Sequence, residues 1–132
     1  MHDPIAIIEG RRIDDIPSLY RELNRVFMIG ESWEIGQSLD ALNDLLYGSY
    51  GVLQGAAKPT VVWKNSEHSR KALGRETTKD YYLSKLSRPD IFNAQRIQQS
   101  LDELENGGGQ TYFDIVLEIF SDHPEISLFL EP

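Results

Sequence analysis

The chain of 132 residues contains no cysteine, which excludes disulfide bonds and thiolate metal sites. This absence favours a cytoplasmic protein, because disulfides belong to oxidising compartments. No apolar run approaches the roughly 20 residues that a membrane-spanning helix needs. The N-terminus also lacks a basic segment followed by an apolar one, so no signal peptide is expected. The sequence therefore predicts a protein without membrane contact.

Positive charge is missing from two long stretches of the chain. No Lys or Arg occurs between Arg25 and Lys58, and none follows Arg96. The net charge is −8, and most of the basic residues gather in residues 58–96. Such segregation of charge indicates a surface that meets a cationic partner. The excess of acids argues against direct binding of nucleic acid, because an acidic surface repels phosphates.

Hydrophobic periodicity and turn residues predict a small α/β fold in a single domain, residues 1–132. Short apolar runs predict strands at Ile5–Glu9, Thr60–Trp63 and Ile126–Leu130. Helical spacing predicts helices between them, near residues 16–27, 39–47, 66–73, 77–86, 91–105 and 112–120. Strands separated by helices imply a three-stranded parallel sheet with helices packed on it.

Helix boundaries follow from capping residues. Asp14 or Asp15 can cap the first helix, Ser38 the second and Asp90 the one that begins near residue 91. A capping box is expected at Thr111, three residues before Asp114.

The expected helix at residues 39–47 carries the most informative pattern. At about 100° per residue, its leucines share one arc, whereas Asp40, Asn43, Asp44 and Tyr47 share the other. Two carboxylates four residues apart repel each other by a few tenths of a kcal/mol. An exposed pair of this kind suggests a cationic partner, and an ordinary solvated helix face is the alternative.

The same segment resembles a known family. Gly36 is followed by Leu39-Asp40-Ala41-Leu42 and then by Asp44, and this pattern resembles the hallmark of the barstar family, inhibitors of bacterial ribonucleases. The resemblance continues in order through the expected first strand and helix, the middle strand with Trp63 at its end, and the last helix and strand. Residues from about 74 to 110 have no counterpart and form an insertion.

The resemblance implies a barstar-like fold, with extra helices from the insertion, and a function in protein binding. It implies an inhibitor or immunity protein, without catalysis or cofactor, that blocks the cationic active site of a bacterial ribonuclease toxin. We expect a monomer that forms a 1:1 complex with this basic protein. The residues that the resemblance and the charge pattern assign to the interface are Glu34, Gly36, Ser38, Asp40, Asn43, Asp44, Tyr47, Gly48, Glu118 and Asp122.

The chain departs from the family pattern at three of these positions. Asn43 stands where the family has a tryptophan, Glu34 where it has a contacting tyrosine, and Ser38 where it has an asparagine.

Two other classes of function stay open. A regulatory adaptor of the same fold would use the insertion, not Asp44, as its contact surface. An enzyme would need a polar pocket, but the three histidines lack paired metal-ligand spacing and Asp40 and Asp44 imply no cleft. A phosphate site at Gly107–Gly109 is disfavoured by the acids that surround it.

The insertion is expected to lie away from the charged face of the 39–47 helix, because its cations would neutralise that face. Its apolar and aromatic residues should turn inward: Tyr81, Tyr82, Leu86, Ile97, Leu101 and Leu104. The competing hypothesis is autoinhibition, in which Arg75, Lys79 or Lys85 pairs with Asp40 and Asp44.

Overall fold

The computed structural model describes residues 3–88 and 93–132. Strands β1 (Ile5–Glu9), β2 (Thr60–Lys64) and β3 (Ser127–Leu130) form a parallel sheet in the order β1-β2-β3. The other elements of the described chain are η1 (Gly10–Arg12), α1 (Ile16–Phe27), α2 (Leu39–Leu46), η2 (Gly51–Leu53), α3 (Ser66–Ala72), α4 (Arg75–Leu86), α5 (Ala94–Glu105) and α6 (Tyr112–Ser121). The expected α/β fold and parallel sheet are confirmed.

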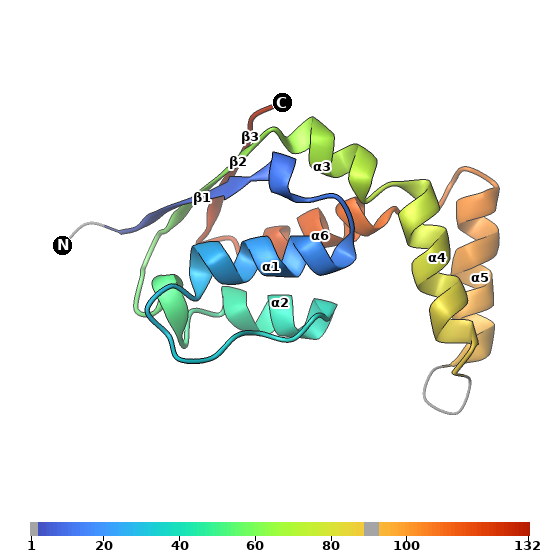
Figure 1. Cartoon of the computed structure of the whole chain (residues 1–132), viewed down its shortest axis with the longest axis horizontal. Coiled ribbons are helices and arrows are strands. Elements are labelled where there is room, and N and C mark those ends of the chain that lie inside the picture. The colour runs from blue at the N-terminus through green and yellow to red at the C-terminus, as the bar shows by residue number, and fades with distance from the viewer. Residues whose placement is uncertain (1–2, 89–92) are drawn as a thin grey trace.

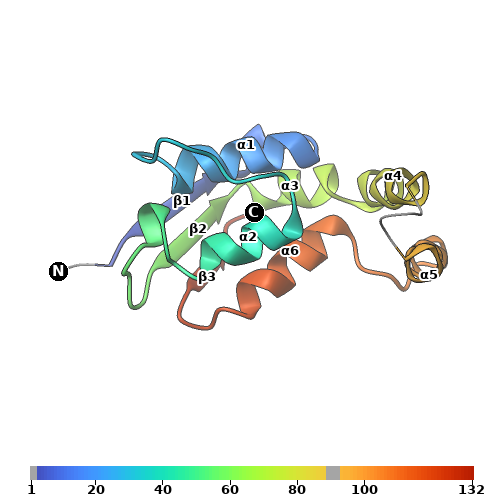
Figure 2. The ribbon, with the colours of Figure 1, turned by 90° about the horizontal axis from the view of Figure 1, so that it is seen from below.

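The body of the molecule is layered. Helices α1 and α6 lie against one face of the sheet, and α2 lies beyond them, on the side remote from the strands (Figure 1; Figure 2). The core between these layers is centred on Trp63, whose ring meets Phe113 and Phe120 edge-on. Its indole Nε1 donates to Ser69 Oγ at 3.0 Å, which satisfies the buried N–H. Because α2 is the outermost layer, its outer side is free to meet a partner.

Two features stabilise helix α2: the N-cap at its start and the burial of its leucines. Ser38 Oγ accepts a hydrogen bond from the Ala41 N–H at 3.0 Å, as an N-cap should. Leu42, Leu45 and Leu46 are at most 2% exposed, so one side of the helix belongs to the core. Burial of a leucine side chain contributes roughly 1.5–3 kcal/mol. The hydrophobic effect therefore holds this short helix in one orientation.

Helices α4 and α5 form a hairpin that projects from one end of the body (Figure 1). As predicted, Ile97, Leu101 and Leu104 are buried. Tyr81, Tyr82 and Leu86 are half-buried. The buried leucines and isoleucine of α5 do not join the main core cluster, so the hairpin has a small core of its own.

The hairpin is tied to the body at the start of α6. The Tyr112 N–H donates to Thr78 Oγ1 at 2.7 Å, and Thr78 Oγ1 donates to the Gly74 carbonyl at 2.7 Å. The Tyr81 ring meets the Tyr112 ring edge-on at 5.0 Å. Tyr112 in turn shares a buried hydroxyl–hydroxyl bond of 2.6 Å with Tyr20 of α1. These contacts fix α4 relative to α1 and α6.

Five predicted helix ends differ from the structure, and the C-terminal ends of α2, α3 and α6 differ by a single residue. Helix α4 begins at Arg75 rather than at residue 77, because Gly74 serves as its N-cap. Asn93 caps α5 through a bond from the Arg96 N–H, whereas Asp90 lies outside the described residues. Helix α2 ends at Leu46 and leaves Tyr47 as its C-cap. The predicted caps at Asp15 and Thr111 are confirmed, each as part of a capping box.

Candidate protein-binding face

The outer side of α2 carries the predicted carboxylate pair. Asp40 and Asp44 are both exposed, and the opposite side of the helix is buried against the core. No Lys or Arg lies in the sequence between Arg25 and Lys58, which includes this helix and the loops on both sides. The two carboxylates therefore stand on a rigid support with no neighbouring base in their own segment.

A hydrogen bond to α1 fixes the loop that precedes α2. The Ile35 N–H donates to Asn24 Oδ1 at 2.8 Å, which ties the loop to α1. Gly36 is exposed, and a Cβ added there would meet nothing within 4 Å. Its φ also lies outside the left-handed region, so no feature of the fold itself requires glycine. Absence of a side chain here leaves room for close approach from outside.

An aromatic pair borders this loop. The Trp33 ring lies 4.6 Å from the Tyr50 ring, and Trp33 remains 47% exposed. Glu31 Oε2 accepts a hydrogen bond from the Gly51 N–H at 2.7 Å, which holds the segment that carries Tyr50. Partial burial raises the pKa of the Tyr50 hydroxyl, and the negative charge of Asp44 raises it further. The charge of Asp44 therefore acts on the Tyr50 hydroxyl.

A buried histidine organises the opposite flank of α2. His123 follows α6 and is 3% exposed. Its Nε2 lies 2.8 Å from Asn43 Oδ1, and because a carbonyl oxygen accepts, this nitrogen carries the hydrogen. The Tyr47 ring meets the imidazole edge-on at 4.7 Å. The imidazole Nδ1 lies 3.7 Å from Glu125 Oε1. The histidine therefore joins α2 to the α6–β3 corner, where Asp122 is exposed.

The eight interface residues predicted on α2 or beside it fall into two groups. The first group is exposed around α2, with Ser38 also serving as N-cap: Glu34, Gly36, Ser38, Asp40, Asp44 and Tyr47. The second group has a visible role inside the fold. Asn43 is half-buried against His123. Gly48 has a φ of +79°, and a Cβ at this position would stand 2.9 Å from the Leu53 carbonyl oxygen.

The two acids predicted on α6 are both exposed but are differently placed. Asp122 is the C-cap of α6 beside His123, whereas Glu118 accepts a hydrogen bond from Gln110 Nε2 at 2.5 Å. The contact of His123 with Asn43 holds the turn that carries Asp122 against α2. The Glu118 carboxylate is instead hydrogen-bonded to Gln110, in the segment before α6.

Sequence reasoning missed Trp33, Tyr50 and the structural role of His123. An exposed tryptophan in a polar loop is the signal that could have drawn attention to Trp33, because large aromatics in exposed loops are enriched at interfaces. The Asn43–His123 contact joins residues that are 80 positions apart, so no local sequence pattern predicts it.

The hairpin does not lie as far from α2 as predicted. Tyr81, Ser84, Lys85 and Arg88 line a pocket whose other wall includes Asp40. The expectation of a separate face is therefore wrong at the N-terminal end of α2. The autoinhibitory pairing is not seen for Arg75, which donates to the Leu104 carbonyl at 3.0 Å, or for Lys79, whose Nζ lies 3.2 Å from Glu105 Oε1.

The described residues include no cluster of three or more His, Asp or Glu side chains placed to hold a metal ion. Within residues 3–88 and 93–132, no helix combines the length and the apolar character needed to cross a membrane.

A search of curated proteins finds no match to this chain. A family profile does match: the family described as "Barstar (barnase inhibitor)" covers residues 4–86. The match includes β1, α2 and α4, so it enters the range assigned to the insertion, and it ends before α6.

This match accords with the fold, a three-stranded parallel sheet in which the helix that carries Asp40 and Asp44 comes between β1 and β2 in chain order. Membership of an inhibitor family also makes the chain a binding protein rather than an enzyme, as the sequence predicts. Because the match covers more than half of the chain and contains the whole of the α2 face, the chain belongs to the barstar family.

Proposed function

We propose that this protein binds a basic bacterial ribonuclease and blocks its cationic active site with the outer face of α2. The observation that carries the proposal is the exposed Asp40–Asp44 pair on a leucine-anchored helix, in a segment without Lys or Arg. Membership of the barstar family supports the same function.

The chemistry of the target explains why carboxylates suit this role. A ribonuclease must hold the phosphates of its substrate, so its active site carries basic side chains. Carboxylates can accept charge-assisted hydrogen bonds from the same side chains and exclude the RNA backbone. The net charge of −8 also attracts a basic partner and speeds encounter.

Rigidity of the acidic face is the second requirement. Burial of Leu42, Leu45 and Leu46 fixes the helix before any partner arrives. Binding then orders few additional groups, and more of the electrostatic attraction is retained as affinity. His123 serves the same end on the flank of α2 by holding Asn43 and Tyr47.

The exposed aromatic pair adds a contact of a different kind. The Trp33 ring packs on Tyr50 and is 47% exposed, so a guanidinium or ammonium group of the partner would stack on it at the edge of the interface. Cation–π contacts of this type contribute about 0.5–2 kcal/mol. This pair would supply aromatic surface in a chain that has Asn43 and Glu34 at positions where the family has aromatics.

We further propose that the protein acts in the cytoplasm as an immunity protein, as a monomer that forms a 1:1 complex with its toxin. The adaptor hypothesis predicts instead that the α2 face is dispensable for binding.

The experiment compares Asp44→Ala with Asp102→Ala. Asp102 is an exposed acid on α5, so both variants lose one negative charge. Calorimetry against a barnase-type ribonuclease should show a Kd at least about 100-fold higher for Asp44→Ala, the range for truncating a desolvated charge at an interface. Asp102→Ala should change the Kd by no more than about threefold, since distant exposed charges contribute little.

Inhibition of RNA cleavage by the same ribonuclease should follow the same order. Equal and small effects of the two substitutions would show that α2 is not the contact surface and would favour the adaptor hypothesis.

A further inference from the structure

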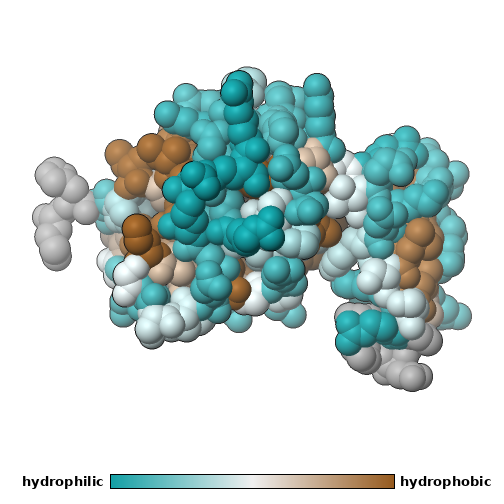
Figure 3. Space-filling model, in the orientation of Figure 1, coloured by the Kyte–Doolittle hydropathy of each residue, from teal (hydrophilic) through white to brown (hydrophobic). Residues whose placement is uncertain are grey.

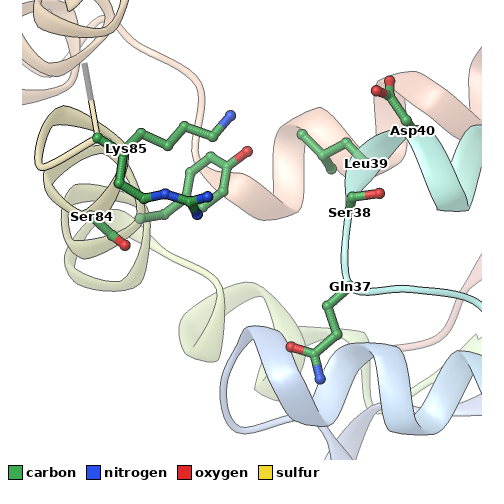
Figure 4. A pocket seen from close by; sticks show the side chains of 8 residues that line it. Gln37, Ser38, Leu39, Asp40, Ser84 and Lys85 are labelled. Atoms are coloured by element: carbon green, nitrogen blue, oxygen red, sulfur yellow. The ribbon is translucent and has the colours of Figure 1, made fainter. Parts of the chain in front are cut away.

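The two ends of α2 have different neighbours. A cleft of about 430 Å³ separates its first turn from helix α4, and Figure 3 shows the hollow between the body and the hairpin. Asp40 lines one wall of this cleft, and Lys85 and Arg88 line the other. Figure 4 shows Lys85 extending from α4 toward the first turn of α2. Farther along the helix, α2 meets His123 of the body instead.

The contact with His123 fixes the orientation of one side chain on the acidic face. The His123 Nε2 donates to Asn43 Oδ1 at 2.8 Å, and the imidazole is 3% exposed. The Tyr47 ring packs edge-on against the same imidazole. Because a carbonyl oxygen can only accept, the oxygen of the Asn43 amide is turned toward the buried histidine. The amide nitrogen is therefore turned away from it.

The Asn43 amide nitrogen carries two N–H donors that the fold leaves unused. No described residue accepts a hydrogen bond from this nitrogen. Within residues 3–88 and 93–132, no side-chain nitrogen or oxygen is both buried and without a hydrogen-bond partner. Asn43 is half-buried, so its amide nitrogen reaches the surface. The helix thus presents N–H donors to the outside.

These donors lie among acceptors. Asn43 comes directly before Asp44 and three residues after Asp40, so the helical period brings all three side chains to the outer arc of α2. Ionised carboxylates can only accept hydrogen bonds. A partner surface made only of cations would pair with both carboxylates and leave the amide donors unpaired. Covering them in this way lowers affinity, because the N–H groups lose their hydrogen bonds to water.

We propose that Asn43 is a specificity-determining residue of the ribonuclease interface, and that its amide N–H groups donate to an acceptor oxygen placed among the cations of the ribonuclease. His123 is its positioning residue, since it holds the amide in the donating orientation. The proposal rests on the proposed function and deepens it. Ribonucleases with an acceptor at that position bind well, and those with a cation there are disfavoured.

Asn43→Asp tests the sign of this interaction. The substitution keeps the shape of the side chain and an oxygen that accepts from His123, but it replaces the two donors by a second acceptor. The Kd for the barnase-type ribonuclease, measured by calorimetry, should rise at least about tenfold, because two acceptors would then oppose each other. General attraction between an acidic inhibitor and a basic ribonuclease predicts the opposite, a lower Kd, because the substitution adds negative charge.

Asn106→Asp is the matched control. Asn106 is the exposed C-cap of α5, on the hairpin and not on the α2 face, so the control adds the same charge elsewhere. It should change the Kd by no more than about threefold, since distant exposed charges contribute little. Circular dichroism and thermal unfolding establish that each variant is folded before binding is measured.

The role of His123 is tested in two backgrounds. His123→Phe keeps a ring for Tyr47 to contact but removes the donor to Asn43. In the otherwise unmodified protein it should raise the Kd about three- to tenfold, because the amide must then be ordered on binding. In Asn43→Ala it should change the Kd by less than about twofold, because two residues that act through one contact are not additive. An equal rise in both backgrounds would show that His123 does not act through Asn43.

Nuclear magnetic resonance of the unmodified protein supplies a measurement that needs no variant. The side-chain N–H groups of Asn43 should exchange with water more slowly in the complex than in the free protein, because an acceptor then holds them. Equally fast exchange in both states would overturn the proposal.

The outcomes separate this proposal from the proposed function. A large effect of Asp44→Ala together with an unchanged or lower Kd for Asn43→Asp would overturn the role of Asn43 and leave the function intact. No inhibition by the unmodified protein would overturn both.

Discussion

Helices α2 and α4 face each other across the cleft, yet they are held by different means. Helix α2 buries three leucines in the main core and begins at a serine cap. Helix α4 buries Thr78 but leaves its tyrosines half-buried, and its N-cap is a glycine without a side chain to accept a hydrogen bond. The acidic helix is thus part of the body, and the basic helix is attached to it.

The difference in packing predicts a difference in local stability between the two helices. Because α2 is packed in the main core, it can lose its orientation only if the body unfolds. A hairpin with a small core of its own can open or change in sequence at lower free-energy cost, because stability differs between cooperative units. The two walls of one cleft are therefore expected to differ in stability as well as in charge.

Truncation of one leucine in each region tests whether the body and the hairpin differ in stability. Leu45→Ala in α2 should lower the free energy of unfolding by about 2–5 kcal/mol, because it leaves a cavity in the main core. Leu101→Ala in α5 should cost no more than the lower end of that range, because the smaller cluster can collapse around the gap. Urea unfolding measures both values.

Two probes identify the region that responds. Both tryptophans, Trp33 and Trp63, lie in the body, so their fluorescence reports the body, whereas circular dichroism reports all helices. For Leu101→Ala, helix loss should precede the fluorescence change. Coincident transitions with equal losses of stability in the two variants would show that hairpin and body form one cooperative unit.

Alkaline pH tests the junction between the two regions. Burial raises the pKa of Tyr112 to about 12, and burial also raises the pKa of Tyr20. In the unfolded chain both tyrosines ionise near pH 10. Their contribution to stability is therefore complete below pH 10 and is lost as the pH rises toward 12, at about 1.4 kcal/mol per pH unit for each tyrosine.

Urea unfolding between pH 8 and 11.5 measures this slope, and absorbance at 295 nm follows phenolate formation. Tyr112→Phe should reduce the slope by about 1.4 kcal/mol per pH unit, which is the contribution of one tyrosine. An unchanged slope in that variant would mean that Tyr112 ionises alike in the folded and unfolded chains.

Much of the fold follows from local sequence. The strand at Ile5–Glu9 and the caps at Asp15, Ser38 and Thr111 were all predictable, because each depends on residues within four positions of one another. The exposed side of α2 was predictable for the same reason: the helical period alone separates Asp44 from the buried leucines.

The rest of the candidate site depends on contacts between distant segments. The Trp33–Tyr50 pair needs the loop to fold back over 17 positions, and the Asn43–His123 bond joins α2 to the far end of α6. The position of α4 was mispredicted because charge alone was considered. The Tyr81–Tyr112 contact and the Thr78 bond place the hairpin beside Asp40, and neither is visible in local periodicity.

The smallest expected effect concerns the bond that joins the two regions. Thr78→Val keeps the shape of the buried side chain but removes the acceptor of the Tyr112 N–H and the donor to the Gly74 carbonyl. Leaving a buried N–H without a partner costs about 1–3 kcal/mol. Thr77→Val is the matched control, because the Thr77 hydroxyl donates to the Ala72 carbonyl at the end of α3 and not to the start of α6.

The location of the lost protection distinguishes a loosened attachment from a loosened core. Amide hydrogen exchange in Thr78→Val should quicken in α4 and at the start of α6, while α2 keeps its protection, because the substitution loosens the attachment and not the main core. Thr77→Val should leave exchange at the start of α6 unchanged. Faster exchange throughout α2 in Thr78→Val would show that the acidic helix relies on the hairpin for its rigidity, and the division between a fixed acidic wall and an attached basic wall would be wrong.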